Sequence, residues 1–153
     1  MTSLTLWRLV AAPVAVALLM MLVLGVAYPL ATWAAGRTLA PWQSDGSLLF
    51  LNGTLVGSEL VAQNFSAATL FHPMPGTSSG QDPYVPIGYA LEQVPRISHA
   101  TGIPQAELRQ LVYSVAAEDS RGVSAVLGPG YPLVNVVQLN YELMKLYPGI
   151  YGR

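Results

Sequence analysis

The sequence predicts an α+β protein: a single N-terminal transmembrane helix followed by a small extracytoplasmic domain with a β-hairpin and about three helices. Three observations lead to this prediction. A long apolar run without charge opens the chain, an Asn-Gly dipeptide separates two β-rich segments, and apolar residues recur at helical spacing in the second half. We expect two parts, an N-terminal transmembrane anchor at 1–36 and an extracytoplasmic domain at 37–153.

The composition narrows the possible classes of protein. Of the 153 residues, 52% are hydrophobic and 10% are charged, whereas about a quarter of the residues in a soluble domain are charged. The formal net charge of −1 gives no basic patch for nucleic acid. The chain contains no Cys, which excludes disulfides and thiolate metal sites.

The anchor is predicted from the run at 9–36, which carries no charged residue and is closed at its two ends by Arg8 and Arg37. A helix needs about 20 apolar residues to cross a bilayer core of roughly 30 Å. Trp7, Tyr28 and Trp33 fall near the two ends of the run, where aromatic rings prefer the lipid headgroup layer. Membrane lipid is therefore an expected partner.

A cleaved signal peptide is the alternative for this segment. Its apolar core spans about 7 to 15 residues, which is shorter than the run observed here, so we favour a retained anchor. Because long domains translocate with little regard to charge, the short basic N-terminal end is expected to stay in the cytoplasm. The prediction is a single-pass membrane protein with the N-terminus in the cytoplasm and the C-terminal domain extracytoplasmic.

Two further features of the anchor concern its faces and its continuity. Ala11 and Ala15 are four residues apart, as are Ala27, Ala31 and Ala35, and small residues at this spacing permit close helix–helix contact. Chance alignment explains these alanines equally well. Pro29 interrupts the helical hydrogen bonds, and we expect it to kink or end the span.

The domain is expected to begin with a hairpin. Asn52-Gly53 favours a type I′ turn, which requires positive φ at both central residues, and predicts strands near 47–51 and 54–57. The segment 64–86 is rich in Ser, Thr, Gly and Pro, so we predict a long loop without regular structure. Loops of this length are usually functional or disordered.

Three helices are expected after this loop. Apolar residues at 87, 91, 94 and 97 predict the first helix, with Pro95 inside it and Gly102 as its stop. A second helix opens at Pro104, and Gly128-Pro129-Gly130 breaks the chain after it. Asn135 caps the last helix, whose apolar positions are 136, 137, 139, 143, 146 and 147.

Residues that could carry chemistry are few. Ser58 lies in Val56-Gly57-Ser58-Glu59 without a G-x-S-x-G elbow, and only His72 and His99 are available as histidine bases. The sequence has no H-E-x-x-H pair and no G-x-x-x-x-G-K-[ST] loop. We therefore expect no catalytic residue, no metal ligand and no cofactor held by this chain, and can name no cofactor-binding residue.

Several short motifs occur in an order that resembles the KdpC family, the C subunit of the Kdp potassium-transporting P-type ATPase of bacteria. They cover nearly the whole chain, and each is weak alone. They are Tyr28-Pro29-Leu30, Asn52-Gly53, Gly57-Ser58, Gln63 with Phe65, Phe71-His72, Ser79-Gly80, Asp82-Pro83, Gln93-Val94, Arg96-Ile97, Val134-Asn135-Val136 and Leu139-Asn140.

This resemblance implies a non-catalytic accessory subunit located in the bacterial inner (plasma) membrane. In the family, the span packs against the channel-like A subunit and the extracytoplasmic domain covers its ion entrance, which anchors and stabilises the complex. ATP and Mg are used by the catalytic B subunit, and a small F subunit is a further partner. A membrane-tethered extracytoplasmic domain whose 64–86 loop closes on a small ligand, unrelated to transport, is the alternative.

The chain departs from the family pattern in ways that indicate a shortened or divergent member. It lacks a Gly-, Ser- and Asn-rich insert before Asp82, and the Arg of a Phe-x-x-Arg-Pro-Ser pattern is missing after Phe71. Tyr84 replaces a common His, and Ala116-Ala117 stands where the family often has His-Thr.

Overall fold

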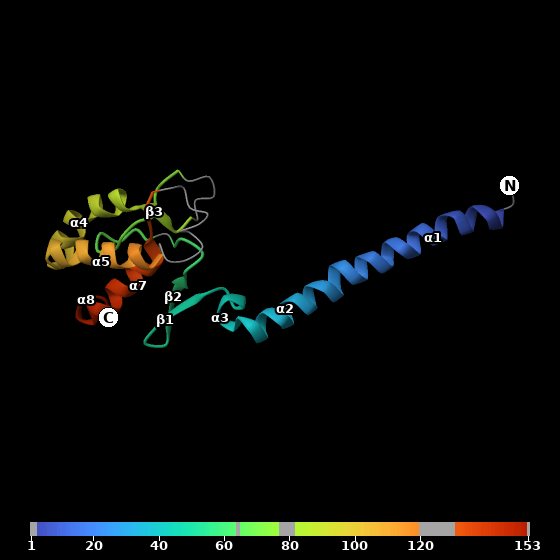
Figure 1. The fold of residues 1–153 in the computed structure, drawn as a ribbon, viewed down its shortest axis with the longest axis horizontal. Coiled ribbons are helices and arrows are strands. Elements are labelled where there is room, and N and C mark those ends of the chain that lie inside the picture. Colours follow the sequence, from blue (N-terminus) through green and yellow to red (C-terminus); the bar gives the residue numbers. More distant parts are fainter. Residues whose placement is uncertain (1–2, 64, 77–81, 120–130, 153) are drawn as a thin grey trace. The chain divides into compact units, whose positions relative to one another are not determined.

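The computed structural model describes residues 3–63, 65–76, 82–119 and 131–152. It divides into two compact units, Met1–Asp45 and Gly46–Arg153, here called the anchor unit and the head (Figure 1). The units meet at Asp45, whereas the sequence prediction put the domain boundary at Gly36, where the charge-free run ends; that boundary stays a prediction. The motif Ser79-Gly80 and the break at 128–130 lie outside the described residues.

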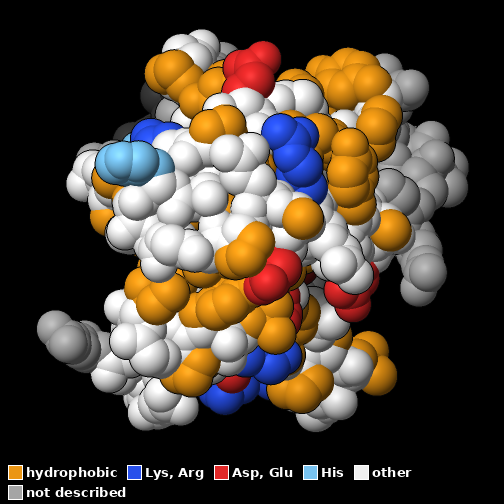
Figure 2. Space-filling model, turned by 90° about the vertical axis from the view of Figure 1, so that its left-hand side faces the viewer, with side chains coloured by type: hydrophobic (Ala, Val, Ile, Leu, Met, Phe, Trp, Pro, Cys, Tyr) orange, Lys and Arg blue, Asp and Glu red, His pale blue; other side chains and the backbone are white. Residues whose placement is uncertain are grey.

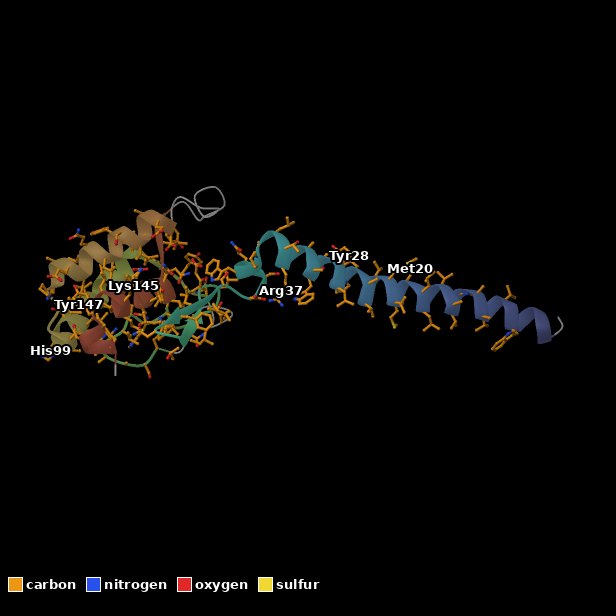
Figure 3. The ribbon with its side chains drawn as sticks, turned by 90° about the horizontal axis from the view of Figure 1, so that it is seen from below. Met20, Tyr28, Arg37, His99, Lys145 and Tyr147 are labelled. Atoms are coloured by element: carbon orange, nitrogen blue, oxygen red, sulfur yellow. The ribbon has the colours of Figure 1, made fainter. Side chains whose placement is uncertain are left out.

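The anchor unit is built on one uninterrupted helical rod. It consists of α1 (Ser3–Leu22), a π-helical turn η1 (Val23–Ala27) and α2 (Tyr28–Leu39). The part Leu9–Leu39 is long and apolar enough to cross a membrane, and it is the one such helix among the described residues. Side chains such as Met20 and Tyr28 project away from the rod and are 48% and 62% exposed (Figure 3). None of the described side chains of the span Leu9–Leu39 is fully buried.

The helix does not end at Pro29, because the π-helical turn accommodates this residue. Proline lacks an N–H and clashes with the carbonyl four residues earlier in an α-helix. In η1 the hydrogen bonds reach one residue further back, and the N–H of Tyr28 donates to the carbonyl of Val23. The widened turn absorbs the proline, so the helix runs on to Leu39.

The anchor unit closes with a short helix, α3 (Pro41–Ser44). The N–H of Ala40 donates to the carbonyl of Gly36 at 2.8 Å. Arg37 stacks its guanidinium 5.3 Å from the ring centre of Trp33 and pairs with Asp45 at 3.2 Å. These contacts hold the end of α3 beside the end of α2.

The head begins with the predicted hairpin, β1 (Leu48–Leu51) and β2 (Thr54–Ser58). Asn52 and Gly53 have φ values of 50° and 79°, as a type I′ turn requires. The prediction of two strands around this turn is confirmed. A bulge lies between Leu49 and Phe50, so that Leu49 pairs with Gly57 and Phe50 with Leu55.

Three helices carry most of the head: α4 (Ile87–Thr101), α5 (Gln105–Asp119) and α7 (Val136–Leu146), followed by the short α8 (Pro148–Tyr151). Gly102 ends α4 with a φ of 76°, and Asn135 caps α7 with its side chain, both as predicted. One prediction is wrong. The end of the 64–86 segment is a strand, β3 (Tyr84–Pro86), paired antiparallel with β4 (Leu133–Asn135).

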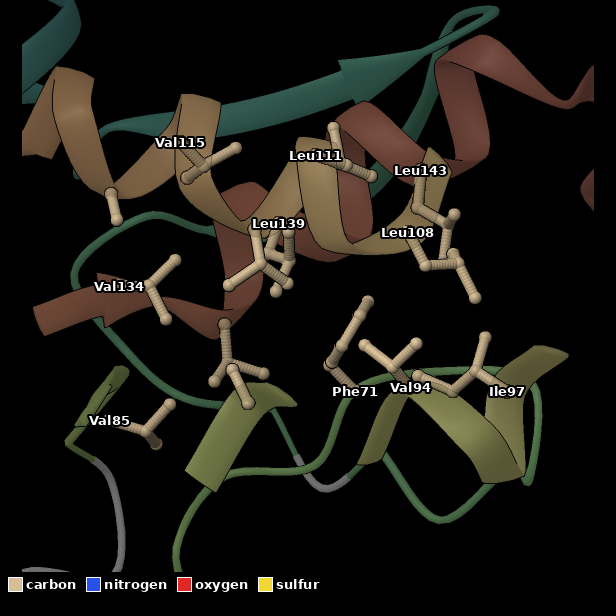
Figure 4. Packing of buried hydrophobic residues seen from close by; sticks show 14 of the residues in the cluster. Phe71, Val85, Val94, Ile97, Leu108, Leu111, Val115, Val134, Leu139 and Leu143 are labelled. Carbon is tan, nitrogen blue, oxygen red and sulfur yellow. The ribbon is translucent and has the colours of Figure 1, made fainter. Parts of the chain in front are cut away.

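The core lies between α4, α5 and α7. Figure 4 shows Val94 and Ile97 facing Leu108 and Leu143 across it, with Phe71 beside Val94 and pointing into the same core. Phe71 belongs to no helix or strand, yet its side chain is fully buried. The loop that carries Phe71 is therefore part of the core, and its backbone needs hydrogen-bond partners away from water.

Candidate functional site

The candidate site is the segment 65–76, here called the central loop, together with the side chains that hold it. Phe71 lies in the middle of this loop. Its N–H donates to Oδ1 of Asn140 at 2.8 Å, and Nδ2 of Asn140 donates back to the Phe71 carbonyl at 2.8 Å. The buried amide of α7 thus pairs with the loop residue as a neighbouring strand would.

The next loop residue is held from the other side in the same way. The N–H of His72 donates to Oε1 of Gln93 at 2.8 Å, and Nε2 of Gln93 donates to the His72 carbonyl at 3.1 Å. Two consecutive residues of the loop are therefore paired with side-chain amides from two different helices, α7 and α4. This arrangement satisfies the backbone of a buried loop without a third sheet.

Arg96 completes the network on α4. Its guanidinium donates to the carbonyl oxygens of Ala68 at 2.6 Å and Leu70 at 2.8 Å, and to Oε1 of Gln93 at 2.8 Å. Burial lowers the pKa of Arg96, and Tyr89 opposes this effect. The planar guanidinium suits several carbonyls at once, so Arg96 orients both the loop and the amide that holds it.

A second junction forms around Asn135, at the start of α7. Its Oδ1 accepts from the N–H groups of Val137 and Gln138 at 2.9 and 3.2 Å, which caps the helix. Its Nδ2 donates to the Glu59 carbonyl at 2.8 Å, and its own N–H donates to Oδ2 of Asp119 at 2.8 Å. One residue therefore ties the end of β2, the end of α5 and the start of α7.

The carboxylates near this junction are partly withdrawn from water. Burial raises the pKa of Glu59, and the nearby charges of Asp119 and Glu118 raise it further. Burial also raises the pKa of Asp119, although the hydrogen bond from the Asn135 N–H opposes the shift. On the face of the molecule drawn in Figure 2, acidic and basic side chains are scattered among apolar ones and do not form a single charged patch.

The residues that could carry chemistry, Ser58, His72 and His99, make structural contacts or lie exposed. Ser58 donates its hydroxyl to the Gly46 carbonyl at 2.7 Å and accepts from the Leu60 N–H at 3.2 Å. A ring nitrogen of His72 lies 2.9 Å from the Ala67 carbonyl, and His99 is exposed near the end of α4. Within the described ranges no hydrogen bond joins Ser58 to either histidine, and no three His, Asp or Glu side chains form a metal-binding group.

Two hollows adjoin the central loop. The first has a volume of about 490 Å³ and is lined by Phe65, Ser66, His72, Pro73, Met74, Pro75, Gly76 and Tyr89. The second, of about 410 Å³, lies between the hairpin and the C-terminal helices and is lined by residues that include Phe65, Met144 and Tyr151. Burial raises the pKa of Tyr151 to about 12, and its hydroxyl donates to the Thr69 carbonyl at 2.7 Å. The loop thus forms one wall of both hollows.

Gln93, Arg96, Asn135 and Asn140 all belong to the short motifs noted in the sequence. Only Asn135 had a predicted role, as a helix cap. The structure shows that the other three hold the central loop. Two other motif residues also pack closely: Phe65 packs against the core, and a Cβ added at Gly57 would lie 3.1 Å from Cγ of Gln63. A glycine there allows Gln63 to lie directly over β2.

Comparison with known proteins gives a match to one family. The family model for KdpC, described as K+-transporting ATPase, c chain, matches residues 10–78 and 74–145. Potassium-transporting ATPase KdpC subunits of Salmonella heidelberg, Salmonella schwarzengrund and Salmonella paratyphi B are each 27% identical over 183 aligned positions, with 84% of this chain and 91% of the relative covered.

The same comparisons show that the chain differs in length from its relatives. The alignment spans 183 positions, whereas this chain has 153 residues, so the relatives carry residues that this chain lacks. The two matched parts meet at residues 74–78, at the end of the central loop. From its anchor, hairpin, loop-binding amides and capped last helix, and from the match along most of its length, the chain belongs to the KdpC family of K+-transporting ATPase subunits.

Proposed function

We propose that this protein is a non-catalytic accessory subunit of a potassium-transporting P-type ATPase complex, which anchors and stabilises the complex. Its head covers the extracytoplasmic ion entrance of a channel-like A subunit. The catalytic B subunit uses ATP and Mg and carries out hydrolysis, and a small F subunit is a further partner. The relatives are named as subunits of a potassium-transporting ATPase, which supports the assignment to such a complex.

The observation that carries this proposal is the use of the family's polar motif residues as structural groups. Gln93 and Asn140 hold the backbone of the central loop, and Asn135 ties three elements together. Polar groups so employed are not free to bind a substrate. They give the head a rigid surface, which is what a partner-binding subunit requires.

The membrane part of the proposal rests on the helix Leu9–Leu39, with its exposed apolar side chains and its length. The N-terminus is placed in the cytoplasm, because Arg8 and the terminal amine are the only positive groups before the span and positive residues of short ends remain inside. The head is then extracytoplasmic.

The test is co-expression with the other pump subunits from the same genome, with an affinity tag on the channel-like subunit. This chain is expected to co-purify, and potassium-stimulated ATP hydrolysis by the purified complex is expected to require it. Assembly of an equally active complex in a strain that lacks this chain would overturn the proposal. Hydrolysis of ATP by this chain alone would contradict the non-catalytic assignment.

The alternative is a tethered ligand-binding domain, and one observation favours it: the hollow of about 490 Å³ beside the central loop. Its walls include Phe65, His72 and Tyr89, a mixture of apolar and polar groups typical of small-molecule sites. Under this alternative, the chain would purify free of pump subunits, and a bound small molecule would be found by native mass spectrometry.

A further inference from the structure

We propose that the outer face of the β1–β2 hairpin, which carries Phe50 and Leu55, rests in the lipid headgroup layer of the membrane that the anchor spans. The partner is lipid rather than protein. The inference rests on the membrane-anchoring part of the proposed function, and it adds a second contact with the bilayer, made by the head.

The hairpin has two unlike faces. Leu49 and Gly57 are register partners and are both buried; Gly57 lies close to Val137 of α7. Phe50 and Leu55 are also register partners, but each is 53% exposed. One cross-strand pair thus faces the core, and the other presents a bulky apolar pair outward.

The lack of charge makes this outward pair unusual. Residues 46–58 contain no Lys, Arg, Asp, Glu or His. Soluble proteins commonly protect exposed hairpins with charged residues, which prevent edge-to-edge association. An uncharged hairpin with an outward aromatic–aliphatic pair suits the boundary between headgroups and acyl chains, which accepts apolar side chains without a complementary shape.

The anchor places its own end at the membrane surface. Arg8 and Arg37 lie at the two ends of the charge-free helical run, and at 1.5 Å per residue they are about 44 Å apart. A bilayer with its headgroup layers is about 40–45 Å thick. Arg37, stacked on Trp33, therefore falls at the outer edge of the headgroups, and Asp45 is held there by its ion pair with Arg37.

The chain from Asp45 to the hairpin has little slack. Only Gly46 and Ser47 separate Asp45 from the first residue of β1, which allows at most about 11 Å between Cα atoms, and about 19 Å to Phe50. Both carbonyls of this tether are bound within the head. The Gly46 carbonyl accepts from the Ser58 hydroxyl, and that of Ser47 accepts from the Glu59 N–H. The tether therefore confines the hairpin to the vicinity of the headgroups.

The test uses single-cysteine variants, since the natural chain has no Cys. Phe50→Cys and Leu55→Cys are labelled with an environment-sensitive fluorophore, and the full chain is placed in vesicles of phosphatidylcholine and phosphatidylglycerol that contain a quencher on the lipid headgroup or acyl chain. Tyr113→Cys on α5 is the matched aqueous control, because Tyr113 is 54% exposed. Leu24→Cys in the anchor is the lipid control.

Probes at 50 and 55 are expected to be quenched several-fold more than the probe at 113, and most strongly by the shallow quencher. Equal quenching at 50, 55 and 113, with position 24 strongly quenched, would overturn the inference and leave the anchor intact. Protection of 50 and 55 only in the assembled pump would assign the face to a protein partner instead. Failure of quenching at 24 would overturn the anchoring itself.

Discussion

The anchor unit and the head satisfy their backbones in different ways. In the anchor, a continuous helix pairs its own backbone N–H and C=O groups, and it continues past Pro29. Its side chains are exposed on the outside of the helix. In the head, a loop runs through the core, and the amide side chains of Asn140 and Gln93 replace missing backbone partners. Polar side chains therefore contribute little to the helical rod of the anchor, whereas in the head they take the place of missing backbone partners.

The strongest way to break this contrast is Asn140→Ala. The change leaves the N–H and C=O of buried Phe71 without partners, at about 1–3 kcal/mol for each group, so we expect the head to lose roughly 2–6 kcal/mol of unfolding free energy. Far-ultraviolet circular dichroism in detergent, with increasing denaturant, measures this. Gln110→Ala, on the exposed face of α5, is the control and should change stability by less than about 0.5 kcal/mol.

A substitution that adds a charge, instead of removing a polar group, tests the anchor. Leu19→Arg places a charge in the middle of the rod, where Leu19 is exposed, and costs about 3 kcal/mol for membrane insertion. The fraction of chain that resists alkaline extraction from membranes should fall, while the denaturation midpoint of the head should not move. Leu19→Val serves as the apolar control. Loss of head stability in Leu19→Arg would show that the two units do not fold independently.

A smaller effect is expected at the hairpin turn. Gly53→Ala forces a Cβ into a φ of 79°, which costs about 1–2 kcal/mol. The matched control is Gly88→Ala in α4, where a Cβ meets nothing within 4 Å and the better helix propensity of alanine should stabilise by up to about 1 kcal/mol. Opposite shifts of the thermal midpoint would support the turn geometry. Destabilisation of similar size by both would contradict it.

The smallest expected effect concerns acid. The folded state raises the pKa of Glu59 above its ordinary value of about 4.5 through burial and the charges of Asp119 and Glu118. A raised pKa favours the protonated form of Glu59 in the folded state. The free energy of unfolding therefore increases as the pH falls through the folded-state pKa, and it decreases as the pH rises through that pKa. Glu59→Gln should therefore raise the thermal midpoint at pH 7, with the difference vanishing below about pH 4. Glu92→Gln, exposed on α4, is the control.

The sequence predicted the elements whose signal is local. Asn52-Gly53 indicated its turn because few dipeptides accept positive φ twice, and Gly102 and Asn135 marked helix ends by their own chemistry. The pairing of β3 with β4 was missed. Each strand has three residues, too few to show a period, and the partners are separated by about fifty positions of the chain.

The candidate site could be predicted only in part, because its residues come together only in the complete fold. An amide on a helix usually faces water, so nothing local distinguishes the buried Asn140 or the half-buried Gln93 from the exposed Gln110. Their partners, Phe71 and His72, are loop residues brought close only by the complete fold. The family resemblance pointed to Gln93 and Asn140 as motif residues, but it did not indicate that they bind the backbone of the central loop.

The π-helical turn at Val23–Ala27 has a consequence for the alanine faces of the anchor. In an uninterrupted α-helix, at about 100° per residue, the stripe of Ala11 and Ala15 and the stripe of Ala27, Ala31 and Ala35 would point to opposite sides. The extra residue in the wide turn rotates everything beyond it by about 100°, which brings the two stripes to roughly a quarter turn from each other. A neighbouring helix that touches both would curl gently around the rod instead of crossing to its far side.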